Sequence, residues 1–134
     1  MNAESAVQHL LALAVEASNN AYIPYSNYPV GAALRALDGT IYSGCNVENA
    51  SYPVTICAER TALVKAISEG RRAFDLIVVV TKNGGSPCGM CRQMLFEFSP
   101  HLRVITADMD GQIHIDAPLD SLLLNGFGPE RLAR

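Results

Sequence analysis

Two short stretches of the chain hold residue types that can bind a metal ion and move a proton. They are Cys57-Ala58-Glu59 and Cys88-Gly89-Met90-Cys91. A Cys-x-x-Cys pair has the usual spacing for two ligands of one tetrahedral zinc ion. With Cys57 as a third thiolate, the fourth position stays open for water, as it does in catalytic zinc sites. The two stretches therefore predict one Zn²⁺ per chain, bound by Cys57, Cys88 and Cys91, that activates water.

Glu59 and Arg60 follow the first of these cysteines. The Glu59 carboxylate is not needed as a ligand, so it is free to transfer protons at the metal-activated water. Regular helix geometry separates residues two apart, so Glu59 reaches that water only if Cys57 lies at the irregular start of a helix. Taken alone, Glu59 is better interpreted as an ordinary first-turn glutamate, which the helix dipole favours. Arg60 stands three residues after Cys57, where its guanidinium can donate to a ligand sulfur.

Other interpretations of the cysteines remain open at this stage. A Cys-x-x-Cys pair by itself is about as often a structural zinc site or a redox pair. A structural site needs a fourth ligand, but His9, His101 and His114 stand in no ligand-spaced motif. A redox motif of the thioredoxin type carries no third cysteine with a glutamate. The combination favours a catalytic zinc site, and Cys45 is expected to be a spectator thiol.

Helices and strands must alternate along the chain to position these residues. Apolar spacing and turn signals predict a first helix before Pro24, a hairpin of strands 30–37 and 41–45, a helix over 59–69, a strand over 75–81, a helix over 88–98, strands over 102–107 and 112–116, and a last helical turn within 119–124. Strand–helix–strand passages favour a mixed α/β sheet with helices on its faces. Both cysteine stretches fall where the chain enters a helix, and helix N-termini stabilise thiolates.

Length, composition and charge limit the class of protein. A chain of 134 residues, of which 49% are hydrophobic and 17% charged, predicts a single domain over residues 1–134. The net charge of -3 and the scattered basic residues argue against a nucleic-acid partner. No apolar run reaches membrane-spanning length, and the N-terminal sequence lacks the pattern of a signal peptide. We therefore expect a cytoplasmic protein with neither nucleic acid nor membrane as a partner.

The motifs, taken in the order in which they occur along the chain, resemble those of the small homotetrameric cytidine deaminases of the three-cysteine zinc type. The resemblance rests on the two cysteine stretches and on Asn46-Val47-Glu48-Asn49-Ala50-Ser51-Tyr52. It extends from Pro24-Tyr25-Ser26 to Phe127-Gly128-Pro129, nearly the whole chain. It implies a three-layer cytidine-deaminase-like α/β fold, in which a mixed five-stranded sheet carries helices on both faces.

The same resemblance implies an activity. Cytidine and 2′-deoxycytidine would be deaminated hydrolytically to uridine and 2′-deoxyuridine, with release of ammonia, as a step of pyrimidine salvage. Zinc-bound hydroxide would attack C4 of the pyrimidine while Glu59 shuttles protons. Arg60 would compensate the negative charge of the three thiolates.

The resemblance also implies how the free nucleoside is bound. Asn46 and Glu48 would hold the ribose 3′-hydroxyl, although residues of these types are also common in turns. The backbone N–H of Ala58 would bind the pyrimidine O2. Tyr28 stands where the family usually has Phe and would stack on the pyrimidine, while its extra hydroxyl could alter local hydrogen bonding.

Three further substrate contacts are implied for a neighbouring subunit of a homotetramer. Ala50 and Tyr52 would help form the 5′-hydroxyl end of that subunit's site, and Phe127 would enter it as well. The dipeptide Asn125-Gly126 precedes Phe127 where the family often has a proline-containing segment. A glycine there frees the backbone that a proline would restrict.

Two rival functions remain. Another aminohydrolase on the same scaffold, such as a blasticidin S deaminase-like enzyme, would share the zinc site, but the Asn46 and Glu48 pair favours cytidine. A non-catalytic zinc-binding interaction module would need a fourth protein ligand that closes the coordination shell. Loss of cytidine absorbance on addition of the protein separates these possibilities.

Overall fold

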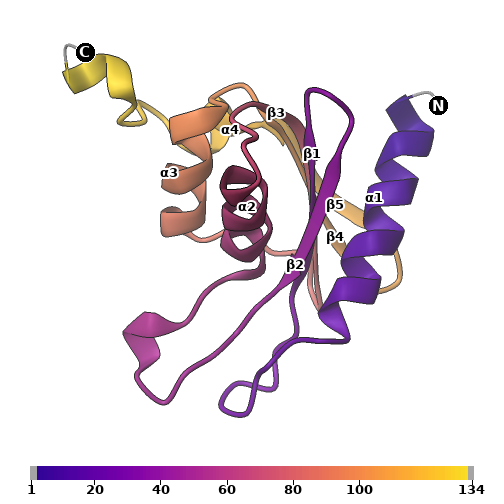
Figure 1. Cartoon of the computed structure of the whole chain (residues 1–134). Helices are drawn as coiled ribbons and strands as arrows, with labels where there is room; N and C mark the ends of the chain where they lie inside the picture. Colours follow the sequence, from indigo (N-terminus) through magenta and orange to yellow (C-terminus); the bar gives the residue numbers. More distant parts are fainter. Residues whose placement is uncertain (1–2, 133–134) are drawn as a thin grey trace.

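A mixed five-stranded sheet forms the middle layer of the protein, in a computed structural model that describes residues 3–132. The strands are β1 (Gly31–Ala36), β2 (Ile41–Cys45), β3 (Phe74–Thr81), β4 (Arg103–Asp108) and β5 (Ile113–Pro118). Their order across the sheet is β2-β1-β3-β4-β5. Strands β3 and β4 run parallel and the other neighbours run antiparallel, as the order of elements predicts (Figure 1).

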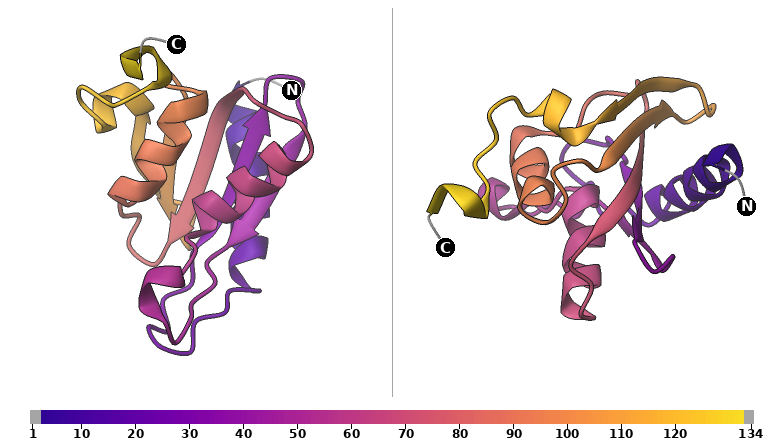
Figure 2. Two further views of the ribbon diagram at one scale, coloured as in Figure 1. Left: turned by 60° about the vertical axis from the view of Figure 1, so that its left-hand side comes forward. Right: turned by 90° about the horizontal axis from the view of Figure 1, so that it is seen from above.

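Helices cover both faces of this sheet. Helix α1 (Ala3–Ser18) lies on one face, and α2 (Ala58–Ser68), α3 (Gly89–Phe98) and the short α4 (Leu119–Leu122) lie on the other (Figures 1 and 2). Two short 3₁₀ turns, η1 (Tyr52–Val54) and η2 (Pro129–Leu132), were not predicted. Across the described part of the chain, none of the helices has the length and apolar character of a membrane span.

Strand β3 is buried between the two helical layers. Its residues Leu76, Val78 and Val80 pack with α1, whereas Ile77 and Val79 pack with α2 and α3. A strand with two buried faces reads as a continuous apolar run, because neither face is selected for polar residues. The unbroken apolar run over 76–80, within the strand predicted over 75–81, therefore indicated the central strand correctly.

The turns that join the antiparallel strands have the conformation that their sequences predict. Asp38-Gly39 joins β1 to β2, and Asp110-Gly111 joins β4 to β5. Gly39 has φ of 91° and Gly111 has φ of 89°, which is the left-handed region that glycine occupies without strain. The two hairpins place β2 and β5 at the edges of the sheet.

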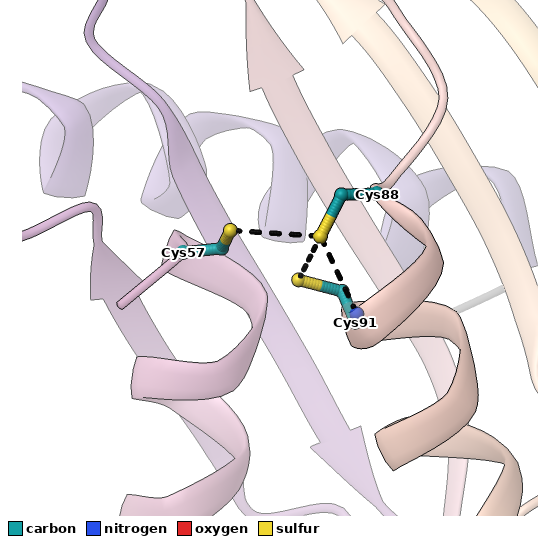
Figure 3. A group of neighbouring side chains, drawn as sticks. All are labelled: Cys57, Cys88 and Cys91. Atoms are coloured by element: carbon teal, nitrogen blue, oxygen red, sulfur yellow. Dashed lines mark hydrogen bonds between the residues drawn. The ribbon is translucent and has the colours of Figure 1, made fainter. Parts of the chain in front are cut away.

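Two close connections bring the starts of α2 and α3 to the same end of the sheet. Helix α2 lies so near β2 that a Cβ atom on Gly44 would stand 2.7 Å from the backbone nitrogen of Ala62. Helix α3 connects the parallel strands β3 and β4, so it begins beyond the carboxyl end of β3. The two helix N-termini consequently lie side by side (Figure 3).

Candidate metal centre and substrate cavity

Three cysteine thiols meet where α2 and α3 begin (Figure 3). Cys57 is the N-cap residue of α2, Cys88 is the N-cap residue of α3, and Cys91 lies in the first turn of α3. The Sγ atom of Cys88 is 3.7 Å from that of Cys57 and 3.2 Å from that of Cys91, and all three lie within 4.8 Å of one another. Two sulfur ligands of a tetrahedral zinc ion stand about 3.8 Å apart. The donor set therefore fits zinc.

Hydrogen-bond donors surround these sulfur atoms. The backbone N–H of Cys91 donates to the Cys88 Sγ at 3.4 Å, and Arg60 Nη2 donates to the Cys57 Sγ at 3.6 Å. Contact with the Cys91 thiol, followed by Arg60 and Cys88, lowers the pKa of Cys57 to about 5. The same contact with Cys57, together with burial, raises the pKa of Cys91. The cluster thus gains one negative charge readily and keeps a proton that a bound cation would displace.

Glu59 lies beside the cluster, and only 4% of its surface is exposed. Cys57 has the extended backbone conformation of an N-cap, with φ of -71° and ψ of 155°, so the regular helix begins only at Ala58. This irregular start lets Glu59 and Cys57 line the same cavity. Burial, with a smaller effect from the negative charge of Cys57, raises the pKa of Glu59 to about 7. The carboxyl group can therefore hold or release a proton close to neutral pH.

A cavity of about 410 Å³ opens from the cluster toward the loops that follow α1 and β2. It brings together most of the residues that the sequence indicated for the site, with several others. The lining residues are Ser26, Tyr28, Val30, Asn46, Glu48, Thr55, Cys57, Ala58, Glu59, Val79, Thr81, Gly85, Ser86 and Cys88.

Asn46 and Glu48 both line this cavity, and both already hold its walls in place. Asn46 Oδ1 accepts from the backbone N–H of Val30 at 3.0 Å, and its Nδ2 donates to the carbonyl of Tyr28 at 2.8 Å. Glu48 accepts from the hydroxyl of Ser26 at 2.5 Å and from its backbone N–H at 3.2 Å, and the hydroxyl contact is the main cause of its lowered pKa. Three donors in all bind the Glu48 carboxylate, because a further backbone N–H donates to its Oε1 at 3.0 Å. One Asn46 N–H and one carboxylate lone pair are therefore left for a ligand.

The model of the family described as the cytidine and deoxycytidylate deaminase zinc-binding region matches residues 4–107, which include all three cysteines. The chain belongs to the cytidine deaminase family. Zinc is accordingly the metal cofactor that the three-thiol cluster holds.

Individual cytidine deaminases are similar to the chain over nearly its whole length. The cytidine deaminase of Sporosarcina psychrophila is 46% identical over 130 residues, which cover 95% of each chain. That of Halalkalibacterium halodurans is 46% identical over 126 residues, covering 92% of this chain and 95% of the other. The crystal structure of cytidine deaminase from Burkholderia pseudomallei superposes with a TM-score of 0.86 at 42% identity and covers 95% of this chain and 100% of that one.

Three residues that the resemblance to cytidine deaminases assigned to the substrate lie apart from the cavity of their own chain. Ala50 is exposed, Tyr52 is 69% exposed and Phe127 is 54% exposed. The Tyr52 ring makes an edge contact with Tyr25, with 5.7 Å between the ring centroids. The Phe127 carbonyl accepts from Gln93 Nε2 at 2.7 Å. Within residues 3–132 of a single chain, the structure does not bring these three residues together with Glu59.

For some cavity residues, the sequence did not indicate which contacts they make. Ser26 was part of the family resemblance, but its contact with Glu48 spans 22 positions and has no local signal. Thr81 ends β3, and its Oγ1 accepts from the backbone N–H groups of Gly84 at 2.8 Å and Gly85 at 3.2 Å. A threonine followed by two glycines before a Cys-x-x-Cys pair was the one available hint that this loop is built around a side chain.

Proposed function

We propose that the chain hydrolyses cytidine and 2′-deoxycytidine to uridine and 2′-deoxyuridine and releases ammonia. The observation that carries the proposal is that a buried carboxyl group, Glu59, shares one cavity with the zinc cluster of a cytidine deaminase family chain. In the reaction, the oxygen of water bonds to C4 of the pyrimidine, the C4–N bond breaks, and the amino nitrogen leaves as ammonia. A cavity of about 410 Å³ lies in the range of small-molecule sites.

The zinc ligands, the carboxyl group and a helix N–H have separate roles in the proposed reaction. Cys57, Cys88 and Cys91 would hold the zinc ion, which would lower the pKa of a water molecule and so supply a nucleophile near neutral pH. Glu59 takes the proton of the attacking water, gives it to N3 of the ring, and later passes a proton to the departing amino group. The backbone N–H of Ala58 binds O2 of the pyrimidine, because the first N–H groups of a helix have no helical partner.

The sugar and the base are recognised in the outer part of the cavity. Tyr28 stacks on the pyrimidine. The free N–H of Asn46 and the Glu48 carboxylate bind the ribose 3′-hydroxyl. Among residues 3–132, none of the side chains that line the cavity is a lysine or arginine. A 5′-phosphate would therefore meet the Glu48 charge without a cation to bind it, which favours free nucleosides over nucleotides.

An absorbance assay with a panel of substrates tests the proposal. We expect turnover of cytidine and 2′-deoxycytidine, and none of cytidine monophosphate. Cytosine should turn over weakly, because it lacks the sugar hydroxyl that would bind the free N–H of Asn46 and the Glu48 carboxylate. Turnover of blasticidin S in preference to cytidine would assign a different aminohydrolase activity. Cytidine monophosphate converted as fast as cytidine would contradict the nucleoside assignment and leave the zinc chemistry intact.

The proposal includes a homotetramer in which neighbouring subunits complete each cavity. Its support is the exposure of Ala50, Tyr52 and Phe127, which resemble residues that reach adjacent sites in the family. Light scattering of the active protein is expected to give four times the mass of one chain, and a fully active monomer would contradict it. We also propose that the protein works in the cytoplasm, because cysteines that bind zinc or stay unpaired, as Cys45 does, are typical of a reducing compartment.

A further inference from the structure

The side chain of Tyr28 connects two walls of the cavity. Its Oη atom lies 2.7 Å from Oδ1 of Asn83, which is 55 positions further along the chain. Asn83 belongs to the loop between β3 and α3, and Gly85 and Ser86 of that loop line the same cavity as Tyr28. Asn83 itself is not among the residues that line the cavity. The contact therefore acts on the aromatic wall from outside the substrate space.

The donors and acceptors around Asn83 determine the direction of the hydrogen bond between Tyr28 and Asn83. Thr81 Oγ1 accepts from the backbone N–H groups of Gly84 and Gly85, which occupies the lone pairs of its hydroxyl group. Its own proton is then donated to Asn83 Oδ1 at 3.3 Å. The amide oxygen is thus the acceptor for Tyr28 as well. The Tyr28 proton is directed at Asn83, so the hydroxyl adds no free donor next to the base.

Both ends of the Tyr28 side chain are held. At the backbone end, the Tyr28 carbonyl accepts from Asn46 Nδ2 at 2.8 Å. At the hydroxyl end, the loop that carries Asn83 is itself anchored, because Thr106 Oγ1 donates to the carbonyl of Gly84 at 2.7 Å in a buried contact. The ring is therefore fixed between two points of the structure, one on each side of the cavity wall.

We propose that Asn83 is a positioning residue that presets the Tyr28 ring for nucleoside binding, an inference that rests on the proposed function. A ring that is already held loses little rotational freedom when a base stacks on it, which favours binding. Asn83 is neither part of the metal cluster nor among the residues that line the cavity, and it acts on the cavity through Tyr28. Its loss therefore weakens binding and leaves the attack at C4 and the proton transfers of Glu59 in place. A single hydrogen bond of this kind corresponds to roughly a two- to twelvefold change in affinity.

Four variants and one control variant test the assignment, with zinc content and thermal midpoint measured for all five. Asn83→Ala is expected to raise KM for cytidine and Kd for uridine roughly two- to twelvefold, with kcat and zinc content unchanged. Asn83→Asp keeps an oxygen acceptor and is expected to restore values close to those of the unmodified protein. Tyr28→Phe removes the donor and should match Asn83→Ala, and the double variant should show no further loss. Lys82→Ala, at an exposed neighbour in the same loop, is the matched control and should change nothing.

Several outcomes would overturn the inference. An Asn83→Ala protein with unchanged KM and Kd would remove Asn83 from substrate positioning. So would a variant that loses zinc, thermal stability and kcat in proportion to its rise in KM, because that pattern marks a general structural role. Additive losses in the double variant would show that the two side chains act independently. If the unmodified protein neither binds nor converts cytidine, the proposed function fails first and the inference fails with it.

Discussion

The metal centre and the nucleoside-facing end of the cavity are built in opposite ways. The metal donors stand at the starts of two helices that pack on the same sheet, and Cys91 and Ala58 there are fully buried. The nucleoside end consists of the loops that follow α1 and β2, and Tyr52 and Phe127 are exposed. The fold of one chain thus preorganises the metal-binding part, whereas the proposed recognition relies on loops and, in the proposed homotetramer, on neighbouring subunits. Substitutions in the metal centre should abolish activity, whereas substitutions in the nucleoside-facing end should reduce it only in part.

Removing one metal ligand is expected to have the largest effect. Cys88→Ser should lose zinc, essentially all turnover and thermal stability together, because metal binding and folding are linked. Elemental analysis, activity and thermal unfolding measure the three losses. Cys45→Ser is the matched control, since Cys45 is a free thiol on β2 outside the cluster, and it should retain zinc. A Cys88→Ser protein that keeps stoichiometric zinc would contradict the ligand set.

Replacing the proton-transfer group should separate chemistry from metal binding. Glu59→Gln is expected to retain zinc and much of the substrate affinity while kcat falls by roughly 10³-fold or more, because one group serves several transfers that each contribute about 10²–10⁴-fold. Single-turnover kinetics and a zinc assay on the same sample measure both. Near-normal turnover would exclude Glu59 from the mechanism and would place the proton relay elsewhere in the cavity.

Arg60 tests whether the charge of the cluster needs compensation. Arg60→Gln removes the donor to the Cys57 sulfur and is expected to lower kcat of the zinc-loaded protein by roughly ten- to a hundredfold. The loss is smaller than for Glu59 because the two helix N-termini still supply part of the positive field. Arg60→Lys keeps the positive charge, and its kcat should lie between those of Arg60→Gln and the unmodified protein. Equal kcat at full zinc occupancy would show that the helix N-termini suffice.

A substitution of Phe127 tests whether recognition requires a neighbouring subunit. Phe127→Ala is expected to raise KM for cytidine about tenfold. The Phe127 ring is exposed in one chain and would become buried in a neighbour's cavity, and the variant would lose the free energy of that burial. The turnover number and zinc content should stay unchanged. Leu37→Ala, at another exposed apolar residue in the β1–β2 turn, is the control. If both variants behave alike, Phe127 is an ordinary surface residue and recognition is complete within one chain.

The fold could be predicted because its signals are local. The helix and strand periods, the two Asp-Gly turns and the apolar run of β3 each lie within a short window of sequence, and each element formed within a few residues of its predicted bounds. The metal donors were equally accessible, since Cys88 and Cys91 are one helical turn apart. The turn at Tyr52–Val54 was missed because it is only three residues long and lacks any periodic pattern.

Contacts between distant segments could not be predicted in the same way. Glu48 was expected to face the sugar with a free carboxylate, yet it also holds Ser26, which is 22 positions away. The Tyr28 hydroxyl was an open question, and its partner Asn83 is 55 positions away. Such pairs depend on how loops are placed by the sheet, and a single sequence has no local pattern that encodes them. The geometry of recognition was therefore the part that needed a structure.

The spacing of Cys57 and Cys88 has a consequence for the unfolding of the chain. They are 31 positions apart, and the segment between them contains α2 and the central strand β3. An ion held by both residues ties this segment into a closed loop, and a permanent link of that length removes about 3–4 kcal/mol of chain entropy from the unfolded state. Unfolding with the ion still bound is therefore disfavoured relative to unfolding of the metal-free chain. Chelation should consequently lower the thermal midpoint and speed hydrogen exchange of the β3 amides, which lie inside the closed loop.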